Sequence, residues 1–233
     1  MLFVHEFHKV VGKRAAAFES HYRDGWMPLL GEGTDARLAW YFDLAHGSGL
    51  AYRVVTVTAV RDGPAYVRLA ERLARGDLQA WARDLDGLQH GSQGRVLATL
   101  PWSPPFPALE ELPTGGDLRE PTMYMEDTMW PFPGKLRPYV EAAGAVYRPA
   151  LAAEDARMHM SVALGLETMP GAGRSPEVTL LQRLSSLEPL IDLLTRDLPP
   201  EVTGPGSWMH EALDLRDRWR SRLLRTAPWS PLP

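Results

Sequence analysis

The sequence predicts an α+β fold in which two tandem β-α-β-β-α-β repeats share one chain of 233 residues. Three observations support this fold. Segments of the first half recur in the second half in the same order, and each half begins with a strand followed by a helix. Both halves also close on nearly the same tail, "TLPWSP" at 99–104 and "TAPWSP" at 226–231. Such self-similarity indicates that one supersecondary unit occurs twice.

The internal echoes define the domain organisation. "TDARLAWYFDLAHG" at 34–47 is matched by "EDARMHMSVALGLE" at 154–167, a shift of 120 that superposes Glu6 on Glu126. The stretch between the halves is rich in proline, glycine and acidic residues without a sustained period, which is typical of a linker. We therefore expect a first repeat at 1–105, a linker at 106–121 and a second repeat at 122–233.

The elements of each repeat follow from local patterns. The first strands are "LFVHEFH" and "TMYMEDT", and a Gly-Lys pair then opens an Ala-rich helical stretch in both halves. Period-two alternation in "ARLAWYFDL" and "ARMHMSVALGL" predicts the second strands, and the apolar runs "AYRVVTVTAV" and "EVTLLQRL" the third. We expect the second helical regions in "GDLQAWARDLDGL" and, more weakly, in "WMHEALDLRDRWRSRLL". The short run before each Pro-Trp-Ser-Pro closes its repeat as a fourth strand.

This order is that of the ferredoxin-like split βαβ unit. Its helices cover only one face of the sheet, so the other face needs cover of its own. Two copies provide this cover if their open faces turn together. The chain is thus predicted to form an internal pseudo-dimeric α+β barrel, either as a monomer or as a homodimer.

Composition excludes several classes of protein. The chain has 45% hydrophobic and 23% charged residues and a net charge of −4, which is typical of a folded protein and argues against a nucleic-acid partner. No apolar run reaches the length of a membrane helix, and the N-terminal stretch is not a signal peptide. With no cysteine, the chain has no disulfides or thiolate nucleophile. We expect a cytoplasmic protein.

Strand alternation predicts which side chains face the barrel lumen. In the first strand of the second repeat, the expected lumen residues are Tyr124, Glu126 and Thr128. In its second strand an apolar set faces the helices (Met158, Met160, Val162 and Leu164), and a polar set faces the lumen (Arg157, His159 and Ser161). The predicted lumen is therefore polar and ionisable.

The repeat transfers this phase to the first half, where it places Glu6, His8 and Tyr41 inward. The alternative phase turns Phe3 and His5 inward instead, since a slip of one residue exchanges every side chain of a strand. We prefer the first phase because the repeat superposes Glu6 on Glu126.

Three features together resemble the NIPSNAP-like group of dimeric α+β barrel proteins. They are the strand followed by Pro133-Gly134-Lys135 and a helix, the valine-rich strand before "RLAERLARGDLQAW", and the duplicated ferredoxin-like order. The first half has Val11 in place of the proline. The resemblance implies the fold. The wider superfamily includes cofactor-free monooxygenases, isomerases, lyases and cyclases of aromatic or polyketide molecules, as well as haem-binding enzymes, and it has no universal catalytic motif.

The predicted lumen residues suggest proton-transfer chemistry. Glu126 with His159, and Glu6 with His8, are candidate acid–base pairs, since burial and neighbouring charges shift such groups toward neutrality. The alternative is that the glutamates are ion-paired with Arg37 or Arg157. The candidates that bind a substrate are Tyr124, Arg157, Ser161 and Tyr41. The two tyrosines either donate to a substrate oxygen or pack in the core.

No cofactor is predicted from the motifs. The seven histidines show no metal-ligand spacing, and no phosphate-binding or nucleophile-elbow motif is present. A haem needs one axial histidine, which His5, His8 or His159 could supply. We therefore expect an enzyme of bacterial, natural-product-like biosynthesis that acts on a hydrophobic, aromatic or polyketide-like substrate by isomerisation, cyclisation, elimination or cofactor-free oxygenation. The alternatives are a haem-binding or non-catalytic ligand-binding barrel, and an assembly protein with a filled lumen.

Overall fold

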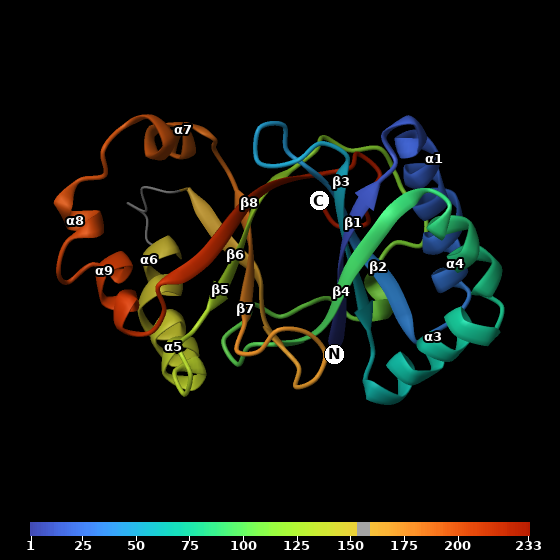
Figure 1. The fold of residues 1–233 in the computed structure, drawn as a ribbon, viewed down its shortest axis with the longest axis horizontal. Coiled ribbons are helices and arrows are strands. Elements are labelled where there is room, and N and C mark those ends of the chain that lie inside the picture. The colour runs from blue at the N-terminus through green and yellow to red at the C-terminus, as the bar shows by residue number, and fades with distance from the viewer. Residues whose placement is uncertain (153–158) are drawn as a thin grey trace. The chain divides into compact units, whose positions relative to one another are not determined.

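The computed structural model describes residues 1–152 and 159–233, and these residues form two compact units. Unit 1 comprises Met1–Ala98, Pro105–Thr122 and Leu223–Pro233, and unit 2 comprises Thr99–Pro104 and Met123–Arg222. The predicted order of strands and helices is present in both repeats (Figure 1).

Unit 1 is an antiparallel sheet with helices on one face. Its strands lie in the spatial order β4-β1-β3-β2, and the end of β2 pairs with residues 224–226 of the last strand, β8 (Arg218–Thr226). The strands are β1 (Leu2–Val10), β2 (Ala36–Leu44), β3 (Arg53–Val60) and β4 (Gln89–Thr99), and the helices are α1 (Ala15–Ser20), α2 (Met27–Gly31), α3 (Gly63–Arg75) and α4 (Gln79–Asp86). A π-helical turn, η2 (His21–Trp26), joins α1 to α2 and turns two buried aromatic residues toward the sheet.

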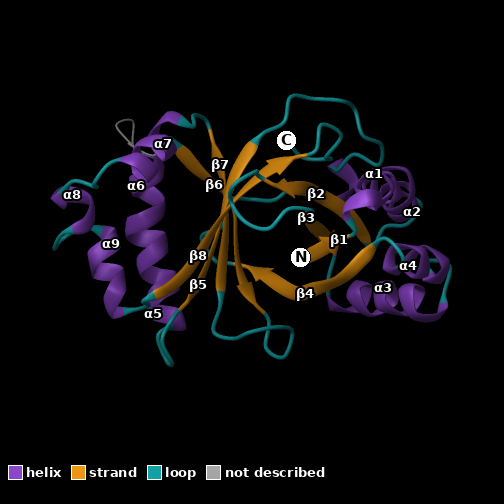
Figure 2. Cartoon of the chain, turned by 45° about the horizontal axis from the view of Figure 1, so that its top comes forward, coloured by secondary structure: helices purple, strands orange, loops and turns teal. Residues whose placement is uncertain are grey.

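Unit 2 has the same plan (Figure 2). Its strands lie in the order β8-β5-β7-β6. They are β5 (Met123–Trp130), β6 (Met160–Thr168), β7 (Val178–Leu184) and β8 (Arg218–Thr226), with the helices α5 (Leu136–Ala142), α6 (Arg148–Ala152), α7 (Glu188–Thr195), α8 (Pro200–Thr203) and α9 (Trp208–Glu211). A second π-helical turn, η4 (Ala143–Tyr147), joins α5 to α6. The helix expected over 208–224 is wrong in its second part, because the chain forms β8 from Arg218 onward.

The Gly-Lys pair serves the strand-to-helix turn of each unit in a different way. In unit 2 the N–H of Lys135 donates to the carbonyl of Phe132. Gly134 has a φ of 75°, a backbone conformation that residues with a side chain rarely adopt. In unit 1 the corresponding glycine is Gly12, and a Cβ there would lie 2.8 Å from the ring of Tyr52. Glycine is therefore favoured by backbone conformation in one repeat, and in the other it leaves room for the ring of Tyr52.

A β-bulge interrupts the second strand of each unit at the corresponding place. The register of β2 against β3 shifts between Leu38 and Trp40, and the register of β6 against β7 shifts between Val162 and Leu164. Because a bulge adds one residue to a strand, the residues beyond it point to the opposite face from the one that simple alternation predicts.

The bulges also align the two repeats residue by residue. In unit 1 the first residue after the bulge pairs with a residue of β3 that also pairs with His5. In unit 2 the first residue after the bulge pairs with a residue of β7 that also pairs with Glu126. His5 is therefore equivalent to Glu126, and Glu6 is equivalent to Asp127. The sequence alignment, which superposes Glu6 on Glu126, is off by one residue at this strand.

Each of the two similar tails lies in the other unit. The tail that ends the first repeat belongs to unit 2, and the tail that ends the second repeat belongs to unit 1. Trp229 lies in the core of unit 1, where its ring is 4.9 Å from that of Tyr41 and its indole N–H donates to Glu19 at 2.7 Å. Trp102 packs on the core of unit 2 and donates to the carbonyl of Val140 at 2.7 Å. Each tail thus contributes a tryptophan to the helix layer of one unit, with its polar nitrogen satisfied.

The stretch expected as a linker packs within unit 1. Leu109 and Leu112 are buried around a short 3-10 turn, and Phe106 lies 4.9 Å from Phe3 and 5.7 Å from Trp40 between ring centroids. Apolar residues in this stretch therefore add to the structure of unit 1.

Candidate functional site

The face of each strand is fixed by its contacts with the helices. We call the face of a unit's sheet that its helices do not cover the helix-free face. In unit 2, Asp127 accepts a hydrogen bond from Gln182 at 2.8 Å, and Gln182 accepts one from Tyr147 of η4 at 2.5 Å. Asp127 therefore faces the helices, and its neighbours Glu126 and Thr128 lie on the helix-free face. The phase predicted for this strand is confirmed.

The phase preferred for the first strand of unit 1 is wrong. His8 lies against the helices, with its ring centroid 5.2 Å from that of Phe18 and 5.5 Å from that of Tyr22. By alternation Glu6 shares this face, and Phe3 and His5 lie on the helix-free face, as the alternative phase had them. The error has a physical origin in the one-residue offset between the repeats, since an odd offset reverses every side chain of a strand.

Tyr41 is also placed on the opposite face from the one expected. Its ring lies 4.9 Å from Trp229 and 5.7 Å from Tyr22, within the helix-side core of unit 1. The bulge after Leu38 reverses the alternation, so Trp40 is turned to the helix-free face near Phe106. Burial raises the pKa of Tyr41 well above its ordinary value, which fits a core role.

The other predicted residues of the second repeat have mixed surroundings. Tyr124 is buried, whereas Ser161 is exposed near the start of β6. His159 is exposed directly before that strand, with a φ of 43°, and its carbonyl accepts hydrogen bonds from Ser185. Arg157 lies outside the described residues. The sequence expectation that His159 occupies a strand position is therefore wrong, and its partnership with Glu126 stays a prediction.

A charged pair occupies the centre of the helix-free face of unit 2. Glu126 has no exposed surface, and its Oε1 accepts a hydrogen bond from Nη1 of Arg222 at 3.1 Å. The Arg222 side chain is 12% exposed. The expected alternatives paired the glutamates with Arg37 or Arg157. Arg37 instead donates to three backbone carbonyls in unit 1 (Leu30, Gly33 and Ala36).

An unsatisfied hydroxyl lies one pleat along from the carboxylate. Thr128 is fully buried on the same face as Glu126, and its Oγ1 has no hydrogen-bond partner among the described residues. A buried polar group without a partner costs free energy, so each case in a native structure calls for an explanation. A ligand group that hydrogen-bonds to this hydroxyl would supply one.

The same face becomes more exposed and more basic toward the end of β5. The guanidinium groups of Arg218, Arg220 and Arg174 lie 5.9, 5.6 and 4.8 Å from the ring centroid of Trp130. The indole N–H of Trp130 donates to Glu177 at 2.7 Å, which fixes the ring. Cations stacked on an aromatic ring form a surface suited to flat or anionic groups. The face thus changes from exposed basic side chains around Trp130 to the buried carboxylate of Glu126.

Sequence reasoning missed the arginines of this site. Arg218, Arg220 and Arg222 alternate at period two along β8, which is the pattern of a strand with one basic face. The expectation of a helix over this stretch concealed that pattern. The signal was present in the sequence "RWRSRLLR".

The corresponding polar network of unit 1 lies on its helix face and is closed. Nδ1–H of His8 donates to Gln89 at 2.9 Å, and Nε2 accepts from the hydroxyls of Thr56 at 3.0 Å and Tyr22 at 3.2 Å. Burial lowers the pKa of His8 to about 4, so the ring is neutral at neutral pH. Every ring nitrogen is occupied, and this is the arrangement of a structural core histidine.

Glu6 lies on the same face as this network. Burial raises the pKa of its carboxyl to about 7, and burial together with the charge of Glu6 raises the pKa of the Tyr22 hydroxyl. Glu6 and His8 therefore share one face, which is the face that the helices cover, and their acid–base partnership stays a prediction.

The histidines differ in their fitness as haem ligands. His8 cannot ligate iron without losing the hydrogen bonds at one of its ring nitrogens, and His159 is exposed directly before β6. His5 is buried on the helix-free face of unit 1 with Phe3 and Trp40, and Nη2 of Arg95 lies 3.4 Å from its ring nitrogens. Among the described residues no group of three or more metal-ligating side chains comes together.

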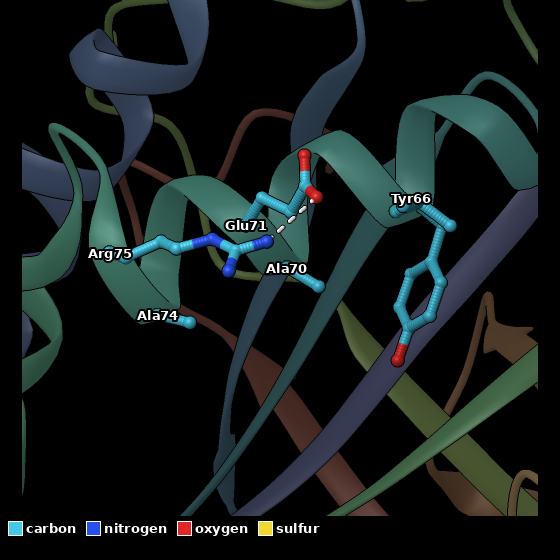
Figure 3. Close-up of a pocket in the computed structure, with 6 residues that line it drawn as sticks. Tyr66, Ala70, Glu71, Ala74 and Arg75 are labelled. Atoms are coloured by element: carbon cyan, nitrogen blue, oxygen red, sulfur yellow. Dashed lines mark hydrogen bonds and ion pairs between the residues drawn. The ribbon is translucent and has the colours of Figure 1, made fainter.

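A shallow depression lies along one side of α3 in unit 1 (Figure 3). Its labelled residues all come from one helix, and the Glu71–Arg75 pair across it is a solvent-exposed i,i+4 ion pair. Such pairs contribute little to stability. The depression brings no buried polar group to its surface, and we assign it no catalytic role.

The structural neighbours define the class of the fold. The chain has the fold of the dimeric α+β barrel proteins, as the sequence predicted. An anthrone oxidase-like protein superposes with a TM-score of 0.61 at 10% identity, covering 97% of this chain and 91% of that protein. A candidate monooxygenase from Lactobacillus acidophilus gives a TM-score of 0.60 at 8% identity, covering 98% and 96%.

A third neighbour is chlorite dismutase from Candidatus Nitrospira defluvii, with a TM-score of 0.53 at 9% identity and coverage of 98% and 92%. At these identities the likeness shows the fold alone. No protein-family profile matches the sequence, and no curated protein sequence matches it. Among the described residues, no helix combines the length and the apolar character that crossing a bilayer requires.

Proposed function

We propose that the protein is a small-molecule enzyme in which Glu126 removes a proton from a hydrophobic or aromatic substrate. The observation that carries this proposal is the buried Glu126–Arg222 pair beside the unpartnered hydroxyl of Thr128. Buried ion pairs are a poor source of stability, because desolvation offsets their attraction. Ionisable groups kept in such places are candidates for catalysis.

The pair suits the formation of a substrate anion. A carbon–hydrogen bond next to a carbonyl breaks, the proton moves to the Glu126 carboxylate, and the electron pair moves onto the carbonyl oxygen. Negative charge thereby passes from Glu126 to the substrate oxygen, and the Arg222 guanidinium that balanced the first charge then stabilises the second. The hydroxyl groups of Thr128 and Tyr124 would donate to that oxygen.

The fate of the anion defines the reaction class. Reprotonation at another carbon is an isomerisation, attack on a second carbonyl is a cyclisation, and loss of a leaving group is an elimination. Reaction with dioxygen as co-substrate is a cofactor-free oxygenation, which the names of the oxidase-like and monooxygenase neighbours favour. The roles of His159, Arg157 and Ser161 in positioning the substrate stay predictions.

Anthrone is a suitable probe, because it is a flat aromatic ketone with an acidic carbon–hydrogen bond. Proton exchange in deuterated buffer, followed by NMR, reports the first step, and oxygen uptake reports oxygenation. We expect Glu126→Gln to lower the enzyme-catalysed exchange about 100-fold or more, as for loss of a general base. Arg222→Gln is expected to lower it as well, because the oxyanion loses its cation.

Arg137→Gln is the matched control, since it removes an exposed arginine of unit 2 that is paired with Glu167. It should leave exchange unchanged. Full exchange in Glu126→Gln would remove the proposed base. Loss of exchange in His159→Ala alone would move the base to that histidine.

A haem-binding role is the second candidate, favoured by the buried His5 on the aromatic helix-free face of unit 1. A haem held there through His5 would supply redox chemistry. The visible spectrum after haem addition tests this role. A Soret band that disappears in His5→Ala supports it, and the absence of a band in the wild-type protein rejects it.

A further inference from the structure

Unit 2 holds a second buried cation, on the opposite side of its sheet from Glu126. Arg216 follows the short 3-10 turn η5 (Ala212–Asp214) and is 7% exposed. Its backbone N–H donates to the carbonyl of Ala212 at 2.9 Å. Its Nε and Nη1 are both buried, and neither has a hydrogen-bond partner among the residues that the structure describes. The proposed catalysis does not use this side chain.

Aromatic rings surround the guanidinium. Its carbon lies 4.4 Å from the ring centroid of Trp219 and 6.0 Å from that of Tyr139. Trp208 packs beside Tyr139 at 5.9 Å and on Tyr147 at 5.6 Å. Trp219 is 45% exposed, so the ring that packs on the buried cation also reaches solvent.

The nearest carboxyl group is already engaged. Asp127 accepts hydrogen bonds from Ser221 at 2.6 Å and from Gln182 at 2.8 Å, one on each of its oxygens. Burial raises its pKa, and these hydrogen bonds and the charge of Arg216 oppose the rise. Among the residues that the structure describes, no ion pair joins Asp127 to Arg216. The cation is therefore only partly compensated.

An incompletely compensated cation in an apolar layer is costly, and the usual solution is a partner of opposite charge. The position offers two free N–H donors and flat apolar walls. A single positive charge with a carboxyl group nearby favours a singly charged anion over a doubly charged phosphate. The walls favour a ligand with an aromatic ring.

We propose that Arg216 is the anchor of a binding site for a small aromatic monocarboxylate, separate from the Glu126 site and on the helix side of unit 2. The carboxylate accepts from the free N–H groups of Arg216, and the ring of the ligand packs among Tyr139, Trp208 and Trp219. Ligand entry requires Trp219 to turn outward.

Calorimetric titration with sodium benzoate tests this site, and the neutral isostere benzamide is its matched ligand. We expect the wild-type protein to bind benzoate at least about tenfold more tightly than benzamide, since a charge-assisted hydrogen bond is lost with the neutral amide. Arg216→Met should weaken benzoate binding by about tenfold or more. Arg196→Gln, which removes an exposed arginine of the same unit, should leave it unchanged.

Two further variants separate the alternatives. Arg222→Gln should retain benzoate binding while losing proton exchange, so failure of this site and failure of the proposed catalysis are distinguishable. Arg216→Met in the absence of ligand should resist urea at least as well as the wild type, because an apolar side chain replaces an uncompensated charge.

Three results would overturn the proposal. One is the absence of benzoate binding in the wild type, and another is unchanged binding in Arg216→Met. The third is inorganic phosphate binding more tightly than benzoate. If Arg216→Met is strongly destabilised and the wild type does not bind benzoate, Arg216 is a structural partner of Asp127.

Discussion

The two units use the same scaffold and place their polar side chains differently. In unit 1 the polar network lies under the helices and is closed, with both ring nitrogens of His8 hydrogen-bonded. The helix-free face of unit 1 is largely aromatic, whereas that of unit 2 carries the Glu126–Arg222 pair and an unpartnered hydroxyl. A closed network stabilises a fold, and an open one is available to a ligand.

The residue-by-residue alignment of the two repeats shows at which positions of the first strand their polar side chains differ. The position of His5 in unit 1 is taken by Glu126 in unit 2, and the position of Glu6 is taken by Asp127. The acidic residue under the helices is thus retained, and the residue on the helix-free face is changed. The proposed base therefore occupies a position at which the two units differ.

The largest effect on stability is expected at His8. His8→Ala removes a fully buried ring and leaves three polar partners unsatisfied, so we expect the free energy of unfolding to fall by about 3 kcal/mol or more. Urea denaturation measures it. His159→Ala is the control and should change stability by less than about 0.5 kcal/mol, since its side chain is exposed. Similar effects of the two substitutions would contradict the closed network.

A pH-dependent effect is expected at Glu6. Its carboxyl has a pKa of about 7 in the folded protein and of 4.5 as a free side chain. Below 4.5 the group is protonated in both states, and as pH rises to 7 the unfolded state ionises first, which costs stability. Glu6→Gln should therefore raise the free energy of unfolding by about 3 kcal/mol at pH 8 and have almost no effect at pH 4. Equal effects at both pH values would exclude a raised pKa.

The smallest effect is expected at Thr128. Thr128→Val replaces an unpartnered buried hydroxyl with a methyl group of similar size, so stability should rise by about 1 kcal/mol while catalysed exchange falls. Thr179→Val changes the residue that pairs with Thr128 on the neighbouring strand, and its change in stability is compared with that of Thr128→Val. A loss of stability in Thr128→Val would show that the hydroxyl is satisfied in the free protein.

The order of elements was predictable from the sequence, because strand alternation, helix periodicity and turn residues are local signals. "TMYMEDT" gives the correct phase of β5, since Met123 and Met125 alternate with Tyr124 and Glu126. The first strand of unit 1 lacks this clarity, because "LFVHEFH" has apolar residues on both faces. A one-residue uncertainty in the repeat alignment was then enough to reverse it.

Other features depend on contacts that local patterns do not contain. The bulges before Trp40 and Leu164 reverse the alternation within a strand, and nothing in "RLAWY" or "SVALG" marks them. The placement of Trp229 in unit 1 depends on long-range packing against Tyr41 and Glu19. The pairing of Glu126 with Arg222 required knowing that β8 lies beside β5.

The most direct test of the account compares the two acidic side chains that the sequence superposes. Anthrone proton exchange is measured in Glu126→Gln and in Glu6→Gln under the same conditions. We predict a fall of about 100-fold or more in the first variant and a change of less than about twofold in the second. Equal losses in both variants, or a loss in Glu6→Gln alone, would contradict the assignment of catalysis to the helix-free face of unit 2.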